Sequence, residues 1–221
     1  MKGIDERTIQ EQWNAIAPEF ERTRVRPWDE VVSFLDACGR SPLLDVGCGH
    51  GRHAIPAIAR GLRCIGVDLS PAMLRAARRN RVEAVEASAA VLPFRNGAFA
   101  SATCIATLHV IPGRAQRLAA LKELARVLAA NAPALVAVWS VEQARFENAA
   151  PWPGAEPGDV KLRWSEAGRS IDRYYHPYTR DELTVELERA NFFVERAWGA
   201  KIGPKRTDNW LALVRSRGTK D

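Results

Sequence analysis

Short apolar segments alternate with helix-forming segments along the chain, which predicts an α/β fold. Such alternation is typical of βαβ units, whose strands run parallel and are covered by helices on both faces. The chain ends in two strand-like segments separated by a loop, which indicates an antiparallel hairpin. We therefore expect a Rossmann-like, doubly wound sheet of seven mostly parallel strands. The expected strands are residues 42–46, 63–67, 82–87, 99–106, 134–140, 192–198 and 209–214.

The helices are expected from their apolar periodicity and their end signals. Residues 8–20 place Ile9, Trp13 and Ile16 on one face, and Pro27 separates this helix from the next. Ser70 before Pro71 is a favourable pair of N-cap and first helical residue. The further expected helices are residues 28–37, 52–60, 71–79, 114–128 and 181–190.

Length and composition favour one globular domain. The chain has 221 residues, of which 47% are hydrophobic and 26% are charged. No apolar run reaches the roughly 18 residues needed to cross a membrane, and the charged N-terminal stretch does not resemble a signal peptide. Its four cysteines form no CxxC pair, so neither a zinc ribbon nor a disulfide framework is expected. We expect a cytoplasmic protein without a metal site.

Two segments lie outside the alternating pattern and are expected to cover a binding site. Residues 1–40 are predicted to form an N-terminal helical lid. Residues 141–178 are rich in proline, glycine and aromatic side chains, and we interpret them as a substrate-side insertion or long loop. Both belong to a single domain over residues 1–221. The net charge of +6 favours a polyanionic partner only mildly, because a basic surface can also be incidental.

A glycine-rich loop follows the first predicted strand. The sequence DVGCGHG at residues 45–51 places glycine at alternate positions, which lets the backbone pass close to a ligand. The spacing matches neither the dinucleotide fingerprint nor the P-loop. The carboxylate of Asp45 would repel a pyrophosphate, so a cationic or amine-bearing ligand fits better. Asp68 ends the next strand, where an acid can accept hydrogen bonds from ribose hydroxyls.

Together these features resemble the class I methyltransferases that use S-adenosylmethionine. The resemblance implies that the glycine-rich loop lines the methionine part of the cofactor and that Asp68 holds the ribose. It also implies an acid near the adenine amine, but Ser88 stands at that position, with its hydroxyl or the backbone of Ala89 as the substitute. The implied cofactor residues are Asp45, Gly47, Cys48, Gly49, Gly51, Asp68, Leu69, Ser88, Ala89, Cys104 and Ile105.

Motifs outside the cofactor loops resemble one family, the tRNA wobble-uridine carboxymethyl methyltransferases, which also occur fused to AlkB-like dioxygenases. The run RYYHxY at residues 173–178 is the strongest match, with weaker ones at residues 13–20, 105–109 and 208–210. The resemblance implies tRNA as the partner and conversion of 5-carboxymethyluridine to its methyl ester. The chain departs from the family at Val110, where a second histidine is frequent.

The implied reaction predicts what the acceptor site contains. A carboxylate is already ionised at neutral pH, so esterification needs placement and desolvation rather than a strong base. A flipped uridine also favours aromatic stacking, for which Trp28, Trp152 and Trp164 are candidates. Arg24 could equally be a surface ion-pair partner, and His109 could cap the helix near Arg114. The candidate catalytic residues are Arg24, His109, Arg173, Tyr174, Tyr175 and His176.

The predicted third strand, Val82 to Ala87, is expected at one edge of the sheet. Relatives of this family bind a small zinc-binding activator protein, and an unpaired edge invites strand addition. Glu83 and Glu86 could instead protect the edge from pairing. Two other functions remain open: a methyltransferase for a small carboxylate or phenol, and a non-catalytic cofactor-binding scaffold.

Overall fold

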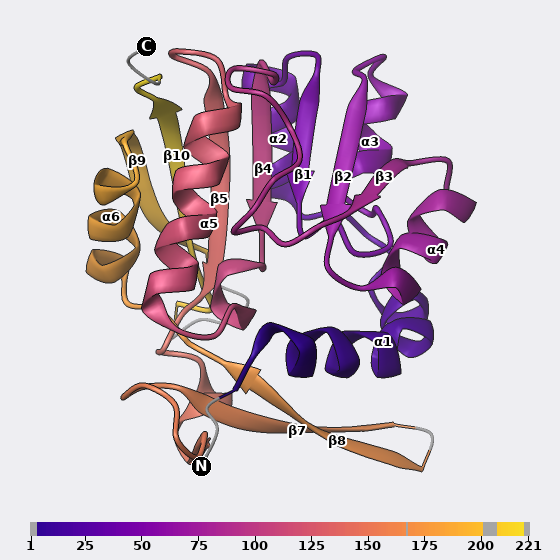
Figure 1. Cartoon of the computed structure of the whole chain (residues 1–221), viewed down its shortest axis with the longest axis vertical. Helices are drawn as coiled ribbons and strands as arrows, with labels where there is room; N and C mark the ends of the chain where they lie inside the picture. The colour runs from indigo at the N-terminus through magenta and orange to yellow at the C-terminus, as the bar shows by residue number, and fades with distance from the viewer. Residues whose placement is uncertain (1–3, 167, 201–206, 219–221) are drawn as a thin grey trace.

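A seven-stranded sheet is the centre of the computed structural model, which describes residues 4–166, 168–200 and 207–218 (Figure 1). Its strand order is β3-β2-β1-β4-β5-β10-β9. Strands β1 to β5 pair in parallel, and β10 pairs antiparallel with both β5 and β9. The predicted fold class is therefore confirmed. The strands are β1 Leu43–Val46, β2 Cys64–Asp68, β3 Glu83–Glu86, β4 Ser101–Ile105, β5 Pro133–Trp139, β9 Phe192–Ala200 and β10 Asn209–Ser216.

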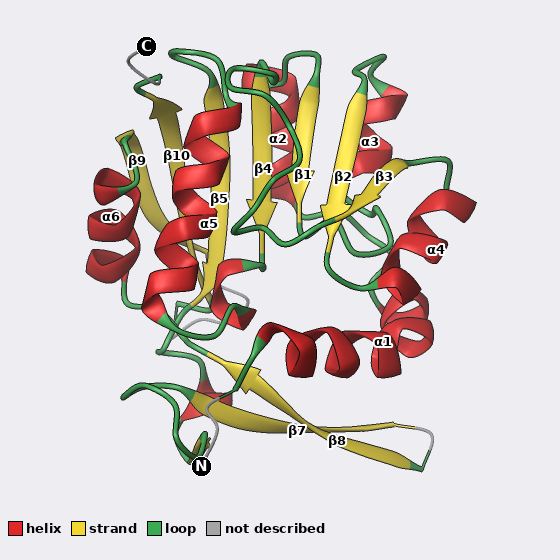
Figure 2. Cartoon of the chain, viewed as in Figure 1, coloured by secondary structure: helices red, strands yellow, loops and turns green. Residues whose placement is uncertain are grey.

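Helices cover both faces of the sheet (Figure 2). Leu44 of β1 packs into a core with α5 and α6, whereas its neighbour Leu43 packs into a second core with α2 and α3. This alternation follows from the period of two along a strand. The helices behind the two cores are α2 Asp29–Cys38, α3 Ala54–Ala59, α4 Pro71–Arg79, α5 Arg114–Val127 and α6 Arg180–Arg189.

Helix α1, Glu6–Thr23, lies across the carboxyl ends of the parallel strands (Figure 1). Asp5 caps it by accepting a hydrogen bond from the Thr8 N–H. Ile16 and Ala17 pack against Met73 of α4, and Asn14 Oδ1 accepts hydrogen bonds from the Ser70 hydroxyl and the Ala72 N–H. Of the predicted lid at 1–40, α1 covers the strand ends, whereas α2 belongs to the core.

The predicted insertion at 141–178 is more regular than a long loop. It contains β6 Ala150–Pro151, β7 Val160–Glu166 and β8 Arg169–Tyr175, which form a separate antiparallel sheet. Figure 1 shows β7 and β8 on the far side of α1 from the main sheet. The long-loop interpretation was wrong here, because the prolines and glycines of residues 151–158 masked the alternation of Val160, Leu162 and Trp164 in β7. Short 3-10 helices span Leu108–Val110 and Ala144–Phe146. None of the described helices is long and apolar enough to cross a membrane.

Candidate active site

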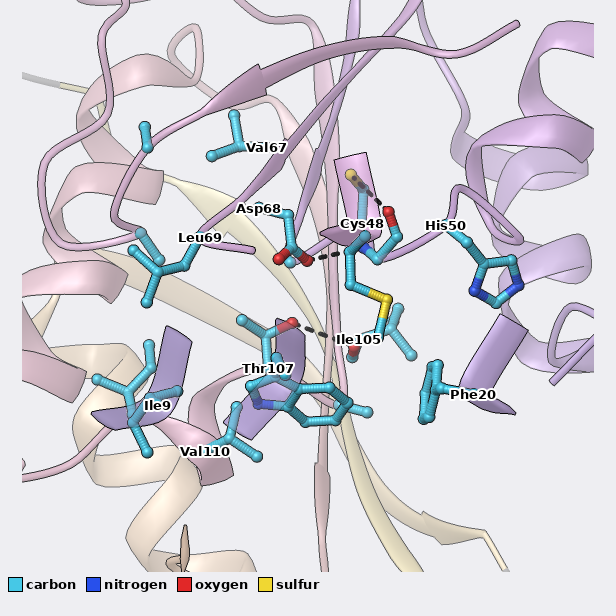
Figure 3. Close-up of a pocket in the computed structure, with 18 of the residues that line it drawn as sticks. Ile9, Phe20, Cys48, His50, Val67, Asp68, Leu69, Ile105, Thr107 and Val110 are labelled. Atoms are coloured by element: carbon cyan, nitrogen blue, oxygen red, sulfur yellow. Dashed lines mark hydrogen bonds between the residues drawn. The ribbon is translucent and has the colours of Figure 1, made fainter. Parts of the chain in front are cut away.

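Two cavities adjoin at the carboxyl ends of the parallel strands, where ligands bind in open α/β sheets. The glycine-loop cavity is lined by residues 47–50, the end of β2 and α1 (Figure 3). The arginine cavity, of about 650 Å³, is lined by Arg24, Arg26, Arg52, Arg145 and Arg173 together with aromatic side chains. A ligand in one cavity would touch walls of the other, because both share Trp13, Phe20, Arg52 and Ala106.

The glycine-rich loop is held tightly against its neighbours. The N–H groups of Gly47 and Cys48 both donate to the Val67 carbonyl, at 2.7 and 2.9 Å. Gly47 has a φ of +70°, and a Cβ there would lie 2.0 Å from Thr107 Oγ1. Gly49 has a φ of +56° and lines the cavity, and a Cβ there would meet nothing within 4 Å. The loop therefore leaves open space beside its backbone for a ligand.

Gly51 has a different role from the one that the resemblance implies. It does not appear among the described residues that line the glycine-loop cavity. A Cβ at Gly51 would lie 2.7 Å from Val82 Cγ2, and its φ is +88°. The structure therefore places Gly51 in the packing between the loop and the start of β3.

Asp68 is fixed at the centre of the glycine-loop cavity. Its Oδ2 accepts a hydrogen bond from the Gly49 N–H at 2.8 Å (Figure 3), and its Oδ1 accepts one from the Ser70 N–H, also at 2.8 Å. Burial raises the pKa of Asp68 above its ordinary value, and the two N–H donors act in the opposite direction. Each carboxylate oxygen keeps a second lone pair, which suits a ligand that carries a diol.

Asp45 is buried and does not line either cavity among the described residues. Its Oδ1 accepts a hydrogen bond from Thr103 Oγ1 at 2.8 Å, and its Oδ2 has no partner. Burial raises the pKa of Asp45 to about 7. Contact with a ligand amine therefore stays a prediction, which the unpartnered oxygen keeps open.

The structure separates the remaining implied cofactor residues into two groups. Cys48, Leu69, Ala89 and Ile105 line the glycine-loop cavity, whereas Cys104 and Ser88 do not appear among its described lining residues. The Ser88 hydroxyl instead donates to a carboxylate oxygen of Glu6 at the start of α1. Glu6 itself lines the cavity. The motifs gave no signal for Glu6, because it lies 82 residues from Ser88 in sequence.

Arg173 lies between two aromatic rings in the arginine cavity. Its guanidinium carbon is 5.2 Å from the centroid of Trp13 and 5.1 Å from that of Tyr175. Its Nε is buried and has no hydrogen-bond partner. Burial lowers the pKa of Arg173, although an arginine so placed stays protonated at neutral pH. A half-buried guanidinium with an unused donor is suited to bind an anion.

Further cations and polar atoms face the same cavity. Arg145, which the sequence analysis missed, lies 4.6 Å above the ring of Trp139. Arg24 is exposed and lines the cavity, and its catalytic role stays a prediction. Tyr175 and Asn209 line the cavity as well, and the hydroxyl of Tyr175 and Oδ1 of Asn209 are buried without a partner. Trp28 and Trp164 also line it, whereas Trp152 packs against Tyr174.

The alternation of β8 divides the RYYH segment. Arg173 and Tyr175 face the arginine cavity, whereas Tyr174 and His176 line neither cavity in the described parts of the chain. Tyr174 accepts a hydrogen bond from Arg117 at 3.4 Å. His176 lies between Asp159 at 2.7 Å and Glu182 at 2.8 Å. The structure thus brings together only half of this predicted group.

His109 lines the arginine cavity, but as a neutral side chain. Burial lowers its pKa to about 3. Its Nδ1 accepts a hydrogen bond from the Trp139 N–H at 3.1 Å, so Nε2 carries the proton and can donate. Its ring stacks on Trp139, with centroids 4.8 Å apart. It does not cap α5, whose N-cap is Gly113.

Comparison with known proteins fits this geometry. Residues 43–131, which run from the start of β1 to just before β5, match the family model described as "Methyltransferase domain". This chain carries a class I methyltransferase domain that uses S-adenosylmethionine. The cavity suits that cofactor, because Asp68 offers acceptors for a ribose diol and Gly49 leaves open space beside the loop.

Curated relatives of this methyltransferase act on tRNA by their names. It is 33% identical over 141 residues to mouse "tRNA (carboxymethyluridine(34)-5-O)-methyltransferase ALKBH8", covering 63% of this chain but only 21% of that protein. The chain thus spans about a fifth of that relative. It is 27% identical over 227 residues to the Schizosaccharomyces pombe tRNA (carboxymethyluridine(34)-5-O)-methyltransferase, covering 93% of this chain and 95% of that one.

Solved structures support the fold alone. A methyltransferase from Methanosarcina mazei has a TM-score of 0.72 at 20% identity, covering 86% of this chain and 98% of that one. A Burkholderia thailandensis 1,6-didemethyltoxoflavin-N1-methyltransferase with bound S-adenosylhomocysteine has a TM-score of 0.70 at 17% identity, over 98% and 92%. The [4+2]-cyclase SpnF is similarly close, with a TM-score of 0.70 at 15% identity over 96% of each chain. The fold therefore does not determine the acceptor.

The contact between Gly47 and Thr107 predicts a steric requirement for glycine. Gly47→Ala should lower the free energy of unfolding by about 3 kcal/mol, because overpacking adds to the strain of a positive φ. Gly61→Ala is the matched control, since Gly61 has a φ of +75° but open space around a Cβ. It should lose only about 1 kcal/mol. Equal losses in urea denaturation would show that the Thr107 contact is unimportant.

The His176 ion pairs predict a pH-dependent stability. Burial alone would lower the pKa of His176, but its hydrogen bonds to Asp159 and Glu182 raise it above the ordinary value. Its stabilising contribution is therefore full below about pH 6.5 and is lost as the pH rises through the raised pKa. The other histidines have pKa values lowered mainly by burial, so they weaken the fold at acid pH instead.

His176→Gln tests this dependence, because the amide does not titrate. At pH 6 the variant should lose about 3 kcal/mol of unfolding free energy, since it leaves two carboxylates without a cation. The difference from the wild type should shrink as the pH is raised above 6.5 in a series of denaturant titrations. A difference that stays constant with pH would mean that His176 is not the titrating group.

Proposed function

We propose that this methyltransferase forms the methyl ester of 5-carboxymethyluridine at the wobble position of tRNA. The observation that carries the proposal is the arginine cavity, which adjoins the cofactor cavity and contains a buried guanidinium donor without a partner. A carboxylate that enters this cavity would find cations and aromatic rings. The names of the curated relatives point to the same acceptor.

The composition of the arginine cavity suits an acceptor that is already an anion. Its described lining residues include the five arginines named above and only two acids, Asp29 and Glu30. When bound, S-adenosylmethionine supplies an electrophilic methyl group. An acceptor carboxylate would already be the nucleophile, so the residues of the cavity would have to hold and orient it, and no proton would have to be removed. Neutral His109 therefore acts as a hydrogen-bond donor through Nε2 rather than as a base.

Arg173 is the group best placed to orient the acceptor. Two aromatic rings and burial restrict its guanidinium, so little conformational freedom is lost when it binds an anion. Tyr175 and Asn209 contribute a hydroxyl and an amide oxygen that also lack partners. Trp28 and Trp164 offer rings on which a flipped base can stack.

Contact with the remainder of the tRNA falls to basic residues at the rim of the arginine cavity, such as the exposed Arg24. The exposed arginines of α4 are partly engaged within the protein, because Arg79 pairs with Glu21 at 2.7 Å and Arg78 donates to the Ala84 carbonyl. The tRNA interaction should therefore weaken with salt mainly through the arginine cavity and its rim.

The direct test is methyl transfer to tRNA that carries free 5-carboxymethyluridine, with the nucleosides analysed by mass spectrometry. The wild type should form the methyl ester. Arg173→Met should lower kcat/KM by about 10- to 100-fold, which corresponds to one hydrogen bond to a charged group. Arg163→Met is the matched control, because Arg163 is an exposed arginine of β7 paired with Asp172. It should stay within about twofold of the wild type.

Different outcomes distinguish the other functions. Turnover of small carboxylates or phenols without RNA, and none with the modified tRNA, would contradict the tRNA proposal while leaving the cofactor site intact. Binding of S-adenosylmethionine without methylation of any acceptor would favour a scaffold, provided that the same preparation also fails with the activator protein discussed below.

The zinc-binding activator is the second partner that we propose, at the free edge of β3. Strand β3 is an edge strand of the main sheet, as predicted, and its residues Ala84 and Val85 are only half-buried. Glu83 is engaged by Arg63 at 3.1 Å, which reduces its repulsion of an added strand. A small protein with an exposed edge could extend the sheet there.

Val85→Pro should weaken capture of the activator at least tenfold in a pull-down, because proline disrupts strand pairing. Phe193→Pro is the control on the opposite edge strand β9, where Phe193 is 55% exposed. It should leave capture unchanged. Undiminished binding by a folded Val85→Pro variant would reject this interface.

A further inference from the structure

The start of α1 brings an acid into the cofactor cavity that the sequence motifs do not supply. Among the described residues that line the glycine-loop cavity, only Asp68 and Glu6 are acidic. Asp68 already accepts hydrogen bonds from the Gly49 and Ser70 N–H groups, and its remaining lone pairs are those expected to bind the ribose hydroxyls. The exocyclic amine of adenine is a hydrogen-bond donor that still requires an acceptor.

We propose that the Glu6 carboxylate accepts this hydrogen bond, so that the bound cofactor itself fastens α1 over the active site. The inference concerns the cofactor and does not depend on which acceptor is methylated. The family resemblance implies that an acid in the loop after β3 binds the adenine amine, but Ser88 stands there. The proposal assigns this hydrogen bond to Glu6 of the N-terminal helix instead.

The geometry of the cavity places the adenine on the side of Glu6. In Figure 3, Leu69 and Ile9 lie on one side of Asp68, and Cys48 and His50 lie on the other. With the ribose on Asp68 and the methionine part along the glycine-rich loop, the adenine extends toward Leu69. That side has apolar walls that also include Ala87 and Ala89.

Hydrogen bonds hold Glu6 at this wall. The Ser88 hydroxyl donates to Oε1 of Glu6, which leaves Oε2 available for a ligand. One turn further along the helix, Gln10 Nε2 donates to the Leu69 carbonyl at 2.8 Å. Ser88 is thus a positioning residue: it does not line the cavity, but it orients the carboxylate that does.

The contact would discriminate between purines. An adenine presents N–H donors to a carboxylate, whereas a hypoxanthine presents a carbonyl oxygen at the same ring position, which a carboxylate repels. The same contact affects the acceptor side, because Trp13 and Phe20 of α1 line both cavities. Fixing the start of α1 therefore shapes the wall against which Arg173 is placed.

Calorimetric titration with S-adenosylhomocysteine and with S-inosylhomocysteine tests the proposal without any acceptor. The wild type should bind the adenosine ligand at least tenfold more tightly than the inosine ligand. Glu6→Gln should weaken binding of the adenosine ligand about tenfold and reduce the preference to about threefold or less, because an amide can donate to the hypoxanthine oxygen. Ser88→Ala should change both values in the same direction but by less.

Glu11→Gln is the matched control, since Glu11 lies in the same helix, is exposed and pairs with Arg7 on the surface. It removes the same charge and should leave both dissociation constants unchanged. Hydrogen exchange gives a second readout: S-adenosylhomocysteine should slow exchange over residues 6–23 in the wild type and less so in Glu6→Gln. An unchanged ligand preference in Glu6→Gln, or an equal loss for both ligands, would overturn the proposal. Neither result would bear on the tRNA proposal, because no acceptor is present.

Discussion

The hydrogen bond from the Gly49 N–H to Asp68 connects the ends of two adjacent parallel strands, and the rest of the site is arranged around it. It holds the glycine-rich loop after β1 against the acid that ends β2. Thr107, which follows β4, packs into the space left by the missing side chain of Gly47. Three neighbouring strand ends are thereby fixed relative to one another. Because a Cβ at Gly47 would overlap Thr107, this arrangement requires the positive φ and the small size of glycine together.

The parts of the structure that sequence predicts well are those with a local cause. The glycine spacing, the acid after β2 and the Ser70-Pro71 helix start are each visible within a few residues, and the structure has them where they were expected. The strand order follows because short βαβ connections allow few alternatives. The individual cofactor and catalytic assignments stay predictions, since they concern a ligand.

The features that sequence did not reveal depend on contacts between distant segments. Glu6 reaches the cofactor cavity only because α1 packs on α4, and Arg145 faces Arg173 only because the β7–β8 hairpin returns beneath α1. The motif RYYH could not indicate which side chains face inward, because that depends on β8 being a strand.

This division of the RYYH segment explains how one strand serves two purposes. Arg173 and Tyr175 face the arginine cavity, while His176 holds the same strand to Asp159 in the insertion and to Glu182 of α6. The contacts of His176 with Asp159 and Glu182 lie on the face of the strand away from the arginine cavity. They restrain the strand when a charged ligand binds on the cavity side. Arg173 is half-buried, and its buried Nε has no hydrogen-bond partner, which is energetically costly; the contacts of His176 anchor the strand that carries it.

The sheet itself carries little information about the acceptor, since a cyclase shares it with a TM-score of 0.70. What distinguishes this chain lies outside the sheet, in α1 and in the three-stranded sheet of β6, β7 and β8. These two additions meet at Trp13 and Arg173, where a residue of α1 and a residue of β8 stack against each other. The arginine cavity is therefore formed only when α1 and the three-stranded sheet are both in place. Helix α1 also lines the glycine-loop cavity. A change near Glu6, at the start of the helix, can therefore alter the position of Trp13 in the arginine cavity without any movement of the sheet.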